Sequence, residues 1–232
     1  MRFQILDIIF NPPHPVTGDV VAPAERLNRV VEMAVLAEQL GIDSYSVGER
    51  HAGDVLSSSP TVVLGAIAQA TERILLSTGV TVLSVLDPVR VAEDLCTVDQ
   101  LSRGRLEIVI GKGNEVLQYP LFGLDIGKQY DYLTENYELL RRLLREEHVD
   151  WSGEYRAALA DVTTLPRPFD GPFRIWHGSA TSARAVDLAA KWGDPIVTAN
   201  ALQPRENYKV LIDRYREHYA AHGHDPAKAY VG

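Results

Sequence analysis

The sequence has 232 residues, of which 46% are hydrophobic and 23% charged, and its formal net charge is −8. This composition is that of a globular protein with a sizeable core, and the negative charge argues against a nucleic-acid or anionic-membrane surface. The single cysteine, Cys96, excludes an internal disulfide and fits a reducing compartment. The N-terminus MRFQILDIIF is strand-like and has neither a membrane span nor a cleavage signal, so we expect a cytoplasmic protein.

The first half of the chain is predicted to alternate strands and helices. Apolar β-branched runs predict the strands, and apolar residues at i, i+3, i+4 spacing predict the helices. Ser59-Pro60 and Asp87-Pro88 each place a capping residue before a proline, which is typical of a helix start, and Gly41 is a natural stop for the first helix. The expected elements are a strand at 2–10, a proline-bearing loop at 11–17, a helix at 23–40, and strands at 43–48, 74–83 and 106–110 separated by helices at 61–71 and 88–101.

The second half continues this alternation with one interruption. Residues 149–172 contain glycine, proline and scattered aromatic residues, including Trp151, Tyr155 and Phe169. We expect an excursion that packs on the core, with a short hairpin as one form, rather than a linker. The aromatics could line a pocket, but packing of a long loop explains them equally well. The remaining expected elements are helices at 130–145, 183–192 and 205–222, strands at 173–177 and 195–198, and the start of a seventh strand at 229–231.

A strand and a helix that recur about every 30 residues predict an α/β fold of the (β/α)8 TIM-barrel type. A doubly wound open sheet is the alternative on pattern alone, but ligand-type segments follow several successive strands rather than one switch point, which favours the barrel. We expect residues 1–232 to form a single barrel domain with the excursion at 149–172. A complete barrel needs two more strands, so we expect either a fragment that lacks its C-terminal part or a barrel closed in another way.

Several motifs, in this order and at this spacing, resemble the bacterial luciferase-like monooxygenase family of flavin-dependent oxidoreductases, from residue 1 to the end of the chain. They are GERH at 48–51, the run from SPTVV to VAEDL at 59–95, LSRGRLEIVIGKG at 101–113, PLFG at 120–123 and WHGSATS at 176–182. The resemblance implies a TIM barrel that is usually longer than this chain. It implies an FMN-dependent monooxygenase that uses reduced flavin and oxygen on a small organic substrate.

The resemblance also bears on cofactors and partners. It implies reduced flavin supplied by a separate reductase, and a homodimer. The same family includes enzymes that use a deazaflavin coenzyme for hydride transfer, and a shortened relative that binds flavin without known turnover. These two remain alternatives for this chain, as does a subunit that completes its barrel with a partner chain. The residues give no indication of a nucleic-acid or membrane partner.

Gly79-Val80 lies within the strand expected at 74–83. A strand glycine can mark a bulge, or it can let a flat ligand approach the backbone. The resemblance implies a non-prolyl cis peptide bond at this dipeptide, packed under the flavin ring.

Two further segments carry groups that suit an anion. Lys112 supplies a cation between two glycines, although a solvated loop lysine is the alternative, and Gly113 allows close backbone approach. The segment from Gly178 to Ser182 precedes a helix, where free N–H groups and hydroxyls suit an anion. Helix capping by one serine is the alternative, and both can be true together. The resemblance puts the flavin phosphate at Ser179 and Ser182, and puts a residue that is often arginine, here Lys112, near the cofactor.

Glu49, Arg50 and His51 follow the strand at 43–48, where barrel enzymes carry catalytic groups. Imidazole can give or take a proton near neutral pH, so His51 is the candidate catalytic residue. The alternative is a Glu49–Arg50 surface pair beside a histidine with structural partners only. The resemblance implies two adjacent histidines in this motif, and Arg50 stands at the first of these positions. The predicted cofactor-binding residues are Gly79, Val80, Lys112, Gly113, Gly178, Ser179 and Ser182.

No metal site is expected. His218, His222 and His224 have a spacing that could suit zinc, but they lie at the polar end of a predicted surface helix without a carboxylate ligand pattern. Cys96 lies on the apolar stripe of a predicted helix, so we expect a buried thiol rather than a nucleophile.

Overall fold

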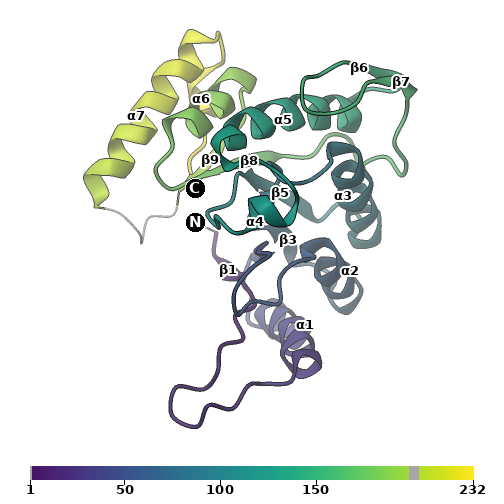
Figure 1. The fold of residues 1–232 in the computed structure, drawn as a ribbon, viewed down its shortest axis with the longest axis vertical. Coiled ribbons are helices and arrows are strands. Elements are labelled where there is room, and N and C mark those ends of the chain that lie inside the picture. Colours follow the sequence, from purple (N-terminus) through teal and green to yellow (C-terminus); the bar gives the residue numbers. More distant parts are fainter. Residues whose placement is uncertain (1, 199–203) are drawn as a thin grey trace.

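The computed structural model describes residues 2–198 and 204–232, and a curled parallel sheet lies at its centre with helices around the outer side (Figure 1). The sheet strands are β1 (Gln4–Asp7), β2 (Ser44–Val47), β3 (Leu75–Thr78), β4 (Thr81–Val82), β5 (Leu106–Gly111), β8 (Ile175–Ser179) and β9 (Ile196–Thr198). The main helices are α1 (Pro23–Gln39), α2 (Pro60–Ala70), α3 (Pro88–Ser102), α5 (Gln129–Arg145), α6 (Ala183–Trp192) and α7 (Arg205–Ala221).

The order of the strands in the sheet follows their order in the chain. The path is β1-β2-β3-β5-β8-β9, every pair is parallel, and β4 pairs with β5 beside this path. A doubly wound sheet reverses its strand order at a switch point, and this sheet has no such reversal, so that alternative is wrong. The arrangement is a half-barrel. Val231, in the segment expected to begin a seventh strand, forms an isolated parallel bridge with Ile196.

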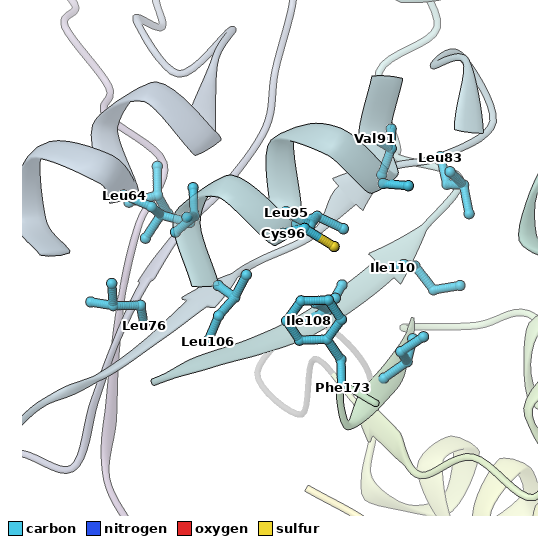
Figure 2. Close-up of a cluster of buried hydrophobic side chains, with 14 of the residues drawn as sticks. Leu64, Leu76, Leu83, Val91, Leu95, Cys96, Leu106, Ile108, Ile110 and Phe173 are labelled. Atoms are coloured by element: carbon cyan, nitrogen blue, oxygen red, sulfur yellow. The ribbon is translucent and has the colours of Figure 1, made fainter. Parts of the chain in front are cut away.

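The main core lies between the outer face of the sheet and the helices. Along β5, Leu106, Ile108 and Ile110 point to this side and are at most 5% exposed. They meet apolar side chains of α2 and α3 (Figure 2). On the other face, Leu6 of the edge strand β1 is 51% exposed, whereas its register neighbours Ser46 and Ser77 are at most 3% exposed. Cys96 is buried in the core, as predicted, and burial raises the pKa of its thiol to about 12.

Helix ends confirm one predicted cap and correct another. The Asp87 carboxylate accepts hydrogen bonds from the N–H groups of Val89 and Arg90 at 2.9 and 3.4 Å and so caps α3, as expected. Ser59 precedes α2, but its side chain makes no capping hydrogen bond, so that prediction is wrong. Proline at the first position of α2 is still consistent with the predicted helix start.

Two predicted strands depart most from their expected bounds. The first ends at Asp7 rather than residue 10, and Phe10 instead forms an isolated antiparallel bridge with Val55. The strand expected at 74–83 is divided into β3 and β4 by Gly79-Val80. A short helix, α4 (Gln118–Leu121), and two 3₁₀ turns, η1 (Ile126–Lys128) and η2 (Pro226–Lys228), were not expected.

The excursion contains an antiparallel hairpin, β6 (Val149–Trp151) and β7 (Leu159–Val162), which confirms the hairpin interpretation. The carboxylate of Glu135 on α5 accepts hydrogen bonds from the N–H groups of residues 154–156, at 2.7 to 3.2 Å. This contact fastens the hairpin to the body of the structure. Across residues 2–198 and 204–232, every helix is too short or too polar to cross a membrane.

Candidate functional site

The predicted site residues lie along one edge of the sheet, at the carboxyl ends of adjacent parallel strands. His51 follows β2, Gly79-Val80 follows β3, Lys112 follows β5, and Ser179 ends β8. Pairing of β2 with β3, of β3 with β5 and of β5 with β8 sets these segments side by side. Residues more than 120 positions apart in the sequence therefore meet at an edge where parallel sheets bind ligands.

The Gly79-Val80 peptide bond is cis, which confirms the expectation for this dipeptide. Gly79 also has a steric reason to lack a side chain. A Cβ atom there would lie 2.5 Å from Ser46 Oγ and 2.7 Å from Leu6 Cδ1, both shorter than real contacts allow. The backbone therefore passes directly over the side chains of β1 and β2.

The side chain of Val80 lies against the ends of two neighbouring strands. A Cβ atom at Gly111 would be 3.0 Å from Val80 Cγ2, and one at Gly178 would be 2.7 Å from Val80 Cγ1. Val80 also packs on a small apolar cluster that includes Val82 and Tyr119. Gly178 therefore has an internal packing role, whether or not it also approaches a ligand.

The backbone of Lys112 is held by three side chains. Its carbonyl oxygen accepts hydrogen bonds from Ser84 Oγ and the Tyr119 hydroxyl, both at 2.9 Å, and from Gln118 Nε2 at 3.2 Å. Gly113 has φ +70°, and a Cβ atom there would lie 2.6 Å from Gln118 Nε2, so turn geometry and packing both require glycine. The predicted lysine lies in a rigid turn.

The ammonium group of Lys112 is half-buried. Nζ donates a hydrogen bond to the Gly113 carbonyl oxygen at 3.0 Å, and it lies 5.8 Å from the centre of the Tyr130 ring. Burial lowers the pKa of Lys112. The guanidinium of Arg184 lies 4.9 Å from the centre of the same ring and pairs with Asp131 at 2.7 Å. Tyr130 thus links Lys112 to the first turn of α6.

Tyr130 and Arg184 were missed in the sequence. Each lies at a helix start, and nothing in its local pattern distinguishes it from an ordinary exposed helix residue. Only the fold brings the two together.

The two predicted serines hydrogen-bond within their own turn. Ser179 Oγ accepts from the Ser182 N–H and donates to the Ser182 carbonyl oxygen, both at 3.1 Å. Ser182 Oγ accepts from the Ala185 N–H at 3.2 Å and caps α6, so the capping explanation is confirmed. The first N–H groups of a helix have no intrahelical acceptor, so the turn can still receive an anion.

Glu49 and Arg50 point in different directions, so the alternative of a Glu49–Arg50 surface pair is wrong. Glu49 is 7% exposed, and its Oε1 lies 2.7 Å from His51 Nε2. Its Oε2 accepts a hydrogen bond from the Val82 N–H at 2.9 Å. Arg50 Nη2 donates to Asn114 Oδ1 at 3.1 Å. The buried Glu49 carboxylate therefore pairs with His51 and not with Arg50.

An aromatic side chain covers the His51 ring. Phe122 follows α4, and its ring meets the imidazole edge to face with 4.8 Å between the ring centres. The His51 side chain is 9% exposed. His51 is therefore a nearly buried imidazole with one carboxylate partner and one aromatic neighbour.

The three histidines near the C-terminus do not converge. His218 Nδ1 lies 3.0 Å from Asp187, and His224 Nε2 lies 3.2 Å from the Lys191 carbonyl oxygen. Among residues 2–198 and 204–232 there is no group of three or more His, Cys, Asp or Glu side chains that could hold a metal ion.

Comparison with known proteins gives one family match over the whole chain. A family model described as luciferase-like monooxygenase matches residues 1–232. The alkanal monooxygenase alpha chain of the Kryptophanaron alfredi symbiont is 26% identical over 226 residues, which are 97% of this chain and 61% of that protein. The chain therefore spans about three fifths of the length of this relative.

Solved structures share the fold. Monooxygenase RslO1 from Streptomyces bottropensis has a TM-score of 0.86 and 26% identity, over 97% of this chain and 68% of that one. The oxygenating constituent of Pseudomonas putida 3,6-diketocamphane monooxygenase, in complex with FMN, has a TM-score of 0.81 at 20% identity, over 100% and 66%. An F420-dependent secondary alcohol dehydrogenase, with an F420-acetone adduct, has a TM-score of 0.76 at 24% identity, over 100% and 68%.

Proposed function

Because this chain belongs to the luciferase-like monooxygenase family, we propose that it is an FMN-dependent monooxygenase that uses reduced flavin and oxygen on a small organic substrate. The observation that carries the proposal is the carboxyl edge itself. A glycine-lined surface around Val80 lies between an imidazole on one side and a lysine with a helix N-terminus on the other. The glycine-lined surface suits a flat ring, and the lysine with the helix N-terminus suits a phosphate tail.

The residues of this edge fit a flavin. Two buried hydroxyls, Ser46 Oγ and Thr81 Oγ1, have no hydrogen-bond partner within the described part of the chain, and both belong to the segments that meet at Gly79 and Val80. A buried hydroxyl without a partner is unfavourable, and polar atoms of a ligand would satisfy it. The small apolar cluster beneath Val80 supports a ring laid on the Gly79-Val80 segment.

The phosphate would be held at the other end of the edge. Lys112 supplies a cation, and the turn from Gly178 to Ser182 presents the positive end of α6. Arg184 adds a second cation near the same turn. We propose that Lys112, Gly113, Gly178, Ser179 and Ser182 bind the phosphate side of the cofactor.

When bound, reduced flavin supplies the electrons for oxygen chemistry, and the protein's part is to bind, orient and exclude water. His51 is the proposed catalytic residue, because an imidazole can take a proton from the substrate and return it to the product. Phe122 would help to exclude water from the His51 ring. A separate reductase, a homodimer and a cytoplasmic location remain part of the proposal.

A deazaflavin-dependent hydride transfer is the second candidate function. The F420-dependent alcohol dehydrogenase shares the fold at a TM-score of 0.76, and this observation favours the alternative over other cofactors. The same edge would take either ring.

A fluorescence titration of the protein with FMN, beside a deazaflavin coenzyme, tests the proposal. Binding of FMN alone is the expected result, and an oxygen-consumption assay with photoreduced FMN would follow. Preference for the deazaflavin would support hydride transfer instead. Binding of neither would contradict both candidate functions.

A further inference from the structure

The side chain of Glu49 connects two parts of the carboxyl edge that are far apart in the chain. One carboxylate oxygen meets His51 Nε2 at 2.7 Å, and the other accepts from the Val82 N–H at 2.9 Å. Val82 belongs to β4, directly after the Gly79-Val80 segment. The position of His51 is therefore tied to the segment on which the flavin ring is proposed to lie.

The buried Glu49 carboxylate needs hydrogen-bond donors at its oxygens. The Glu49 side chain is 2% exposed, and burying a carboxylate is costly unless its oxygens are hydrogen-bonded. Within the described residues, its partners are the His51 ring and one backbone N–H. Replacing either partner would leave a buried acceptor unsatisfied, so the three groups hold one another in place.

The carboxylate also selects which ring nitrogen of His51 carries the proton. An ionised carboxylate can only accept, so Nε2 must be the donor and Nδ1 of the neutral ring must be the acceptor. Nδ1 has no hydrogen-bond partner in the part of the chain that the structure describes. The ring atom free to take a proton is therefore Nδ1.

We propose that Glu49 is the positioning residue of the site: it holds His51 as an Nε2–H donor, anchors it to β4, and so reserves Nδ1 for proton transfer with the bound substrate. The proposal rests on the proposed function in taking His51 as the residue that meets substrate. When Nδ1 takes a proton, the imidazolium and the Glu49 carboxylate form a buried ion pair. The return of that proton to the product restores the neutral ring.

The test is nitrogen-15 NMR of the histidine rings in the full chain, with His51→Gln to assign the His51 signals. The wild-type ring should show a single Nε2–H form with an Nε2 proton that exchanges slowly. Glu49→Ala should lose this slow proton and give a mixture of both ring forms. Glu49→Gln offers one carbonyl oxygen to two donors; with that oxygen on the Val82 N–H, its NH2 group faces Nε2, and the ring should shift towards the Nδ1–H form.

Glu38→Gln is the matched control. The Glu38 carboxylate also accepts backbone N–H bonds, from residues 72–74, but it does so before β3, at the opposite end of the sheet. This variant should lose stability and leave the His51 signals unchanged. A purely structural role for Glu49 would make Glu49→Ala behave in the same way.

Two results would overturn the proposal. One is a wild-type His51 ring that carries its proton on Nδ1, which needs no variant to fold. The other is a Glu49→Ala protein whose His51 signals match the wild type. An FMN titration of the same samples separates this proposal from the proposed function: absence of FMN binding in the wild type would contradict the function, while the ring spectra still decide the role of Glu49.

Discussion

The hydroxyl of Tyr119 donates a hydrogen bond to the main-chain carbonyl oxygen of Lys112 at 2.9 Å. The same hydroxyl lies 3.0 Å from Ser84 Oγ, which also reaches that carbonyl. A buried phenol at the end of a short helix thus fixes the backbone of the one lysine proposed to bind the cofactor. The position of Lys112 depends on side chains that need not touch a ligand.

Tyr119→Phe removes one of the donors to the Lys112 carbonyl. The loss should lower the free energy of unfolding by about 1 kcal/mol and weaken FMN binding by roughly fivefold to tenfold. Tyr215→Phe is the control, because its buried hydroxyl donates to the Asp194 carbonyl oxygen at 2.8 Å, away from Lys112. Denaturation and FMN titration of both variants check this. Equal FMN affinities in the two variants would contradict the role of Tyr119.

Ser182→Asp tests the phosphate site without removing the helix cap. Aspartate and asparagine both cap helices well, so stability should change by no more than about 0.5 kcal/mol in either variant. A carboxylate at this position would repel a phosphate, and FMN affinity should fall about tenfold in Ser182→Asp but little in Ser182→Asn. Comparable FMN affinities for the two variants would show that no phosphate binds at the start of α6.

Gly178→Ala tests the contact between Val80 and the end of β8. The added methyl would meet Val80 Cγ1 at 2.7 Å, so unfolding free energy should fall by about 1–3 kcal/mol. Truncation of the clashing side chain in a Gly178→Ala, Val80→Ala double variant should recover part of this loss. The double-mutant cycle measured by chemical denaturation should give a coupling of at least ~0.5 kcal/mol.

Gly65→Ala is the control for this cycle. Gly65 lies inside α2, and the nearest atom to an added Cβ is 3.8 Å away, so alanine should stabilise the protein by about 0.5–1 kcal/mol. Strictly additive effects of the Gly178 and Val80 substitutions would show that the contact with Val80 does not limit the side chain at position 178.

Ionisation of Cys96 should lower the stability of the protein at high pH. Burial raises the pKa of its thiol to about 12 in the folded state, above the ordinary thiol value of about 8.5. The contribution of the buried neutral thiol to the free energy of unfolding is fully present below the thiol pKa of the unfolded chain. It is lost as the pH rises from that value towards 12. Iodoacetamide at pH 8 should therefore modify Cys96 only when the protein is unfolded. Rapid modification of the folded protein would contradict this burial.

Repetition of strand and helix signals made most of the fold predictable. Asp87 and Pro88 mark a helix start through local chemistry alone, and α3 begins there. The position of the break between β3 and β4 could not be read from residue types, because Ser77 and Gly79 interrupt the apolar, β-branched run from Leu75 to Leu83 without showing where strand pairing stops. Gly79 alone allowed a bulge or a close ligand approach, and only the resemblance to a family indicated a cis bond at Gly79-Val80.

The sequence predicts which segments form the candidate site, but not which side chains touch one another within it. The sequence indicates His51 because it follows a strand, Lys112 because it is a cation between two glycines, and Ser179 because its segment precedes a helix and resembles a phosphate site. The inward turn of Glu49 was not found, because its second partner, Val82, lies 33 positions away. The joining of Lys112 and Arg184 through Tyr130 depends on the packing of α5 against α6 and has no sequence signal.

The strand order of the sheet makes the site modular. Since neighbours along the sheet path follow one another in the chain, each unit brings one part of the edge: β2 the imidazole, β3 the proposed platform for a ring, β5 the lysine and β8 the helix N-terminus. Recombination between relatives at the loops on the opposite edge would exchange one of these parts and leave the others in place. Exchange of the β2 unit alone would replace the imidazole and leave the three parts proposed to hold a cofactor unchanged.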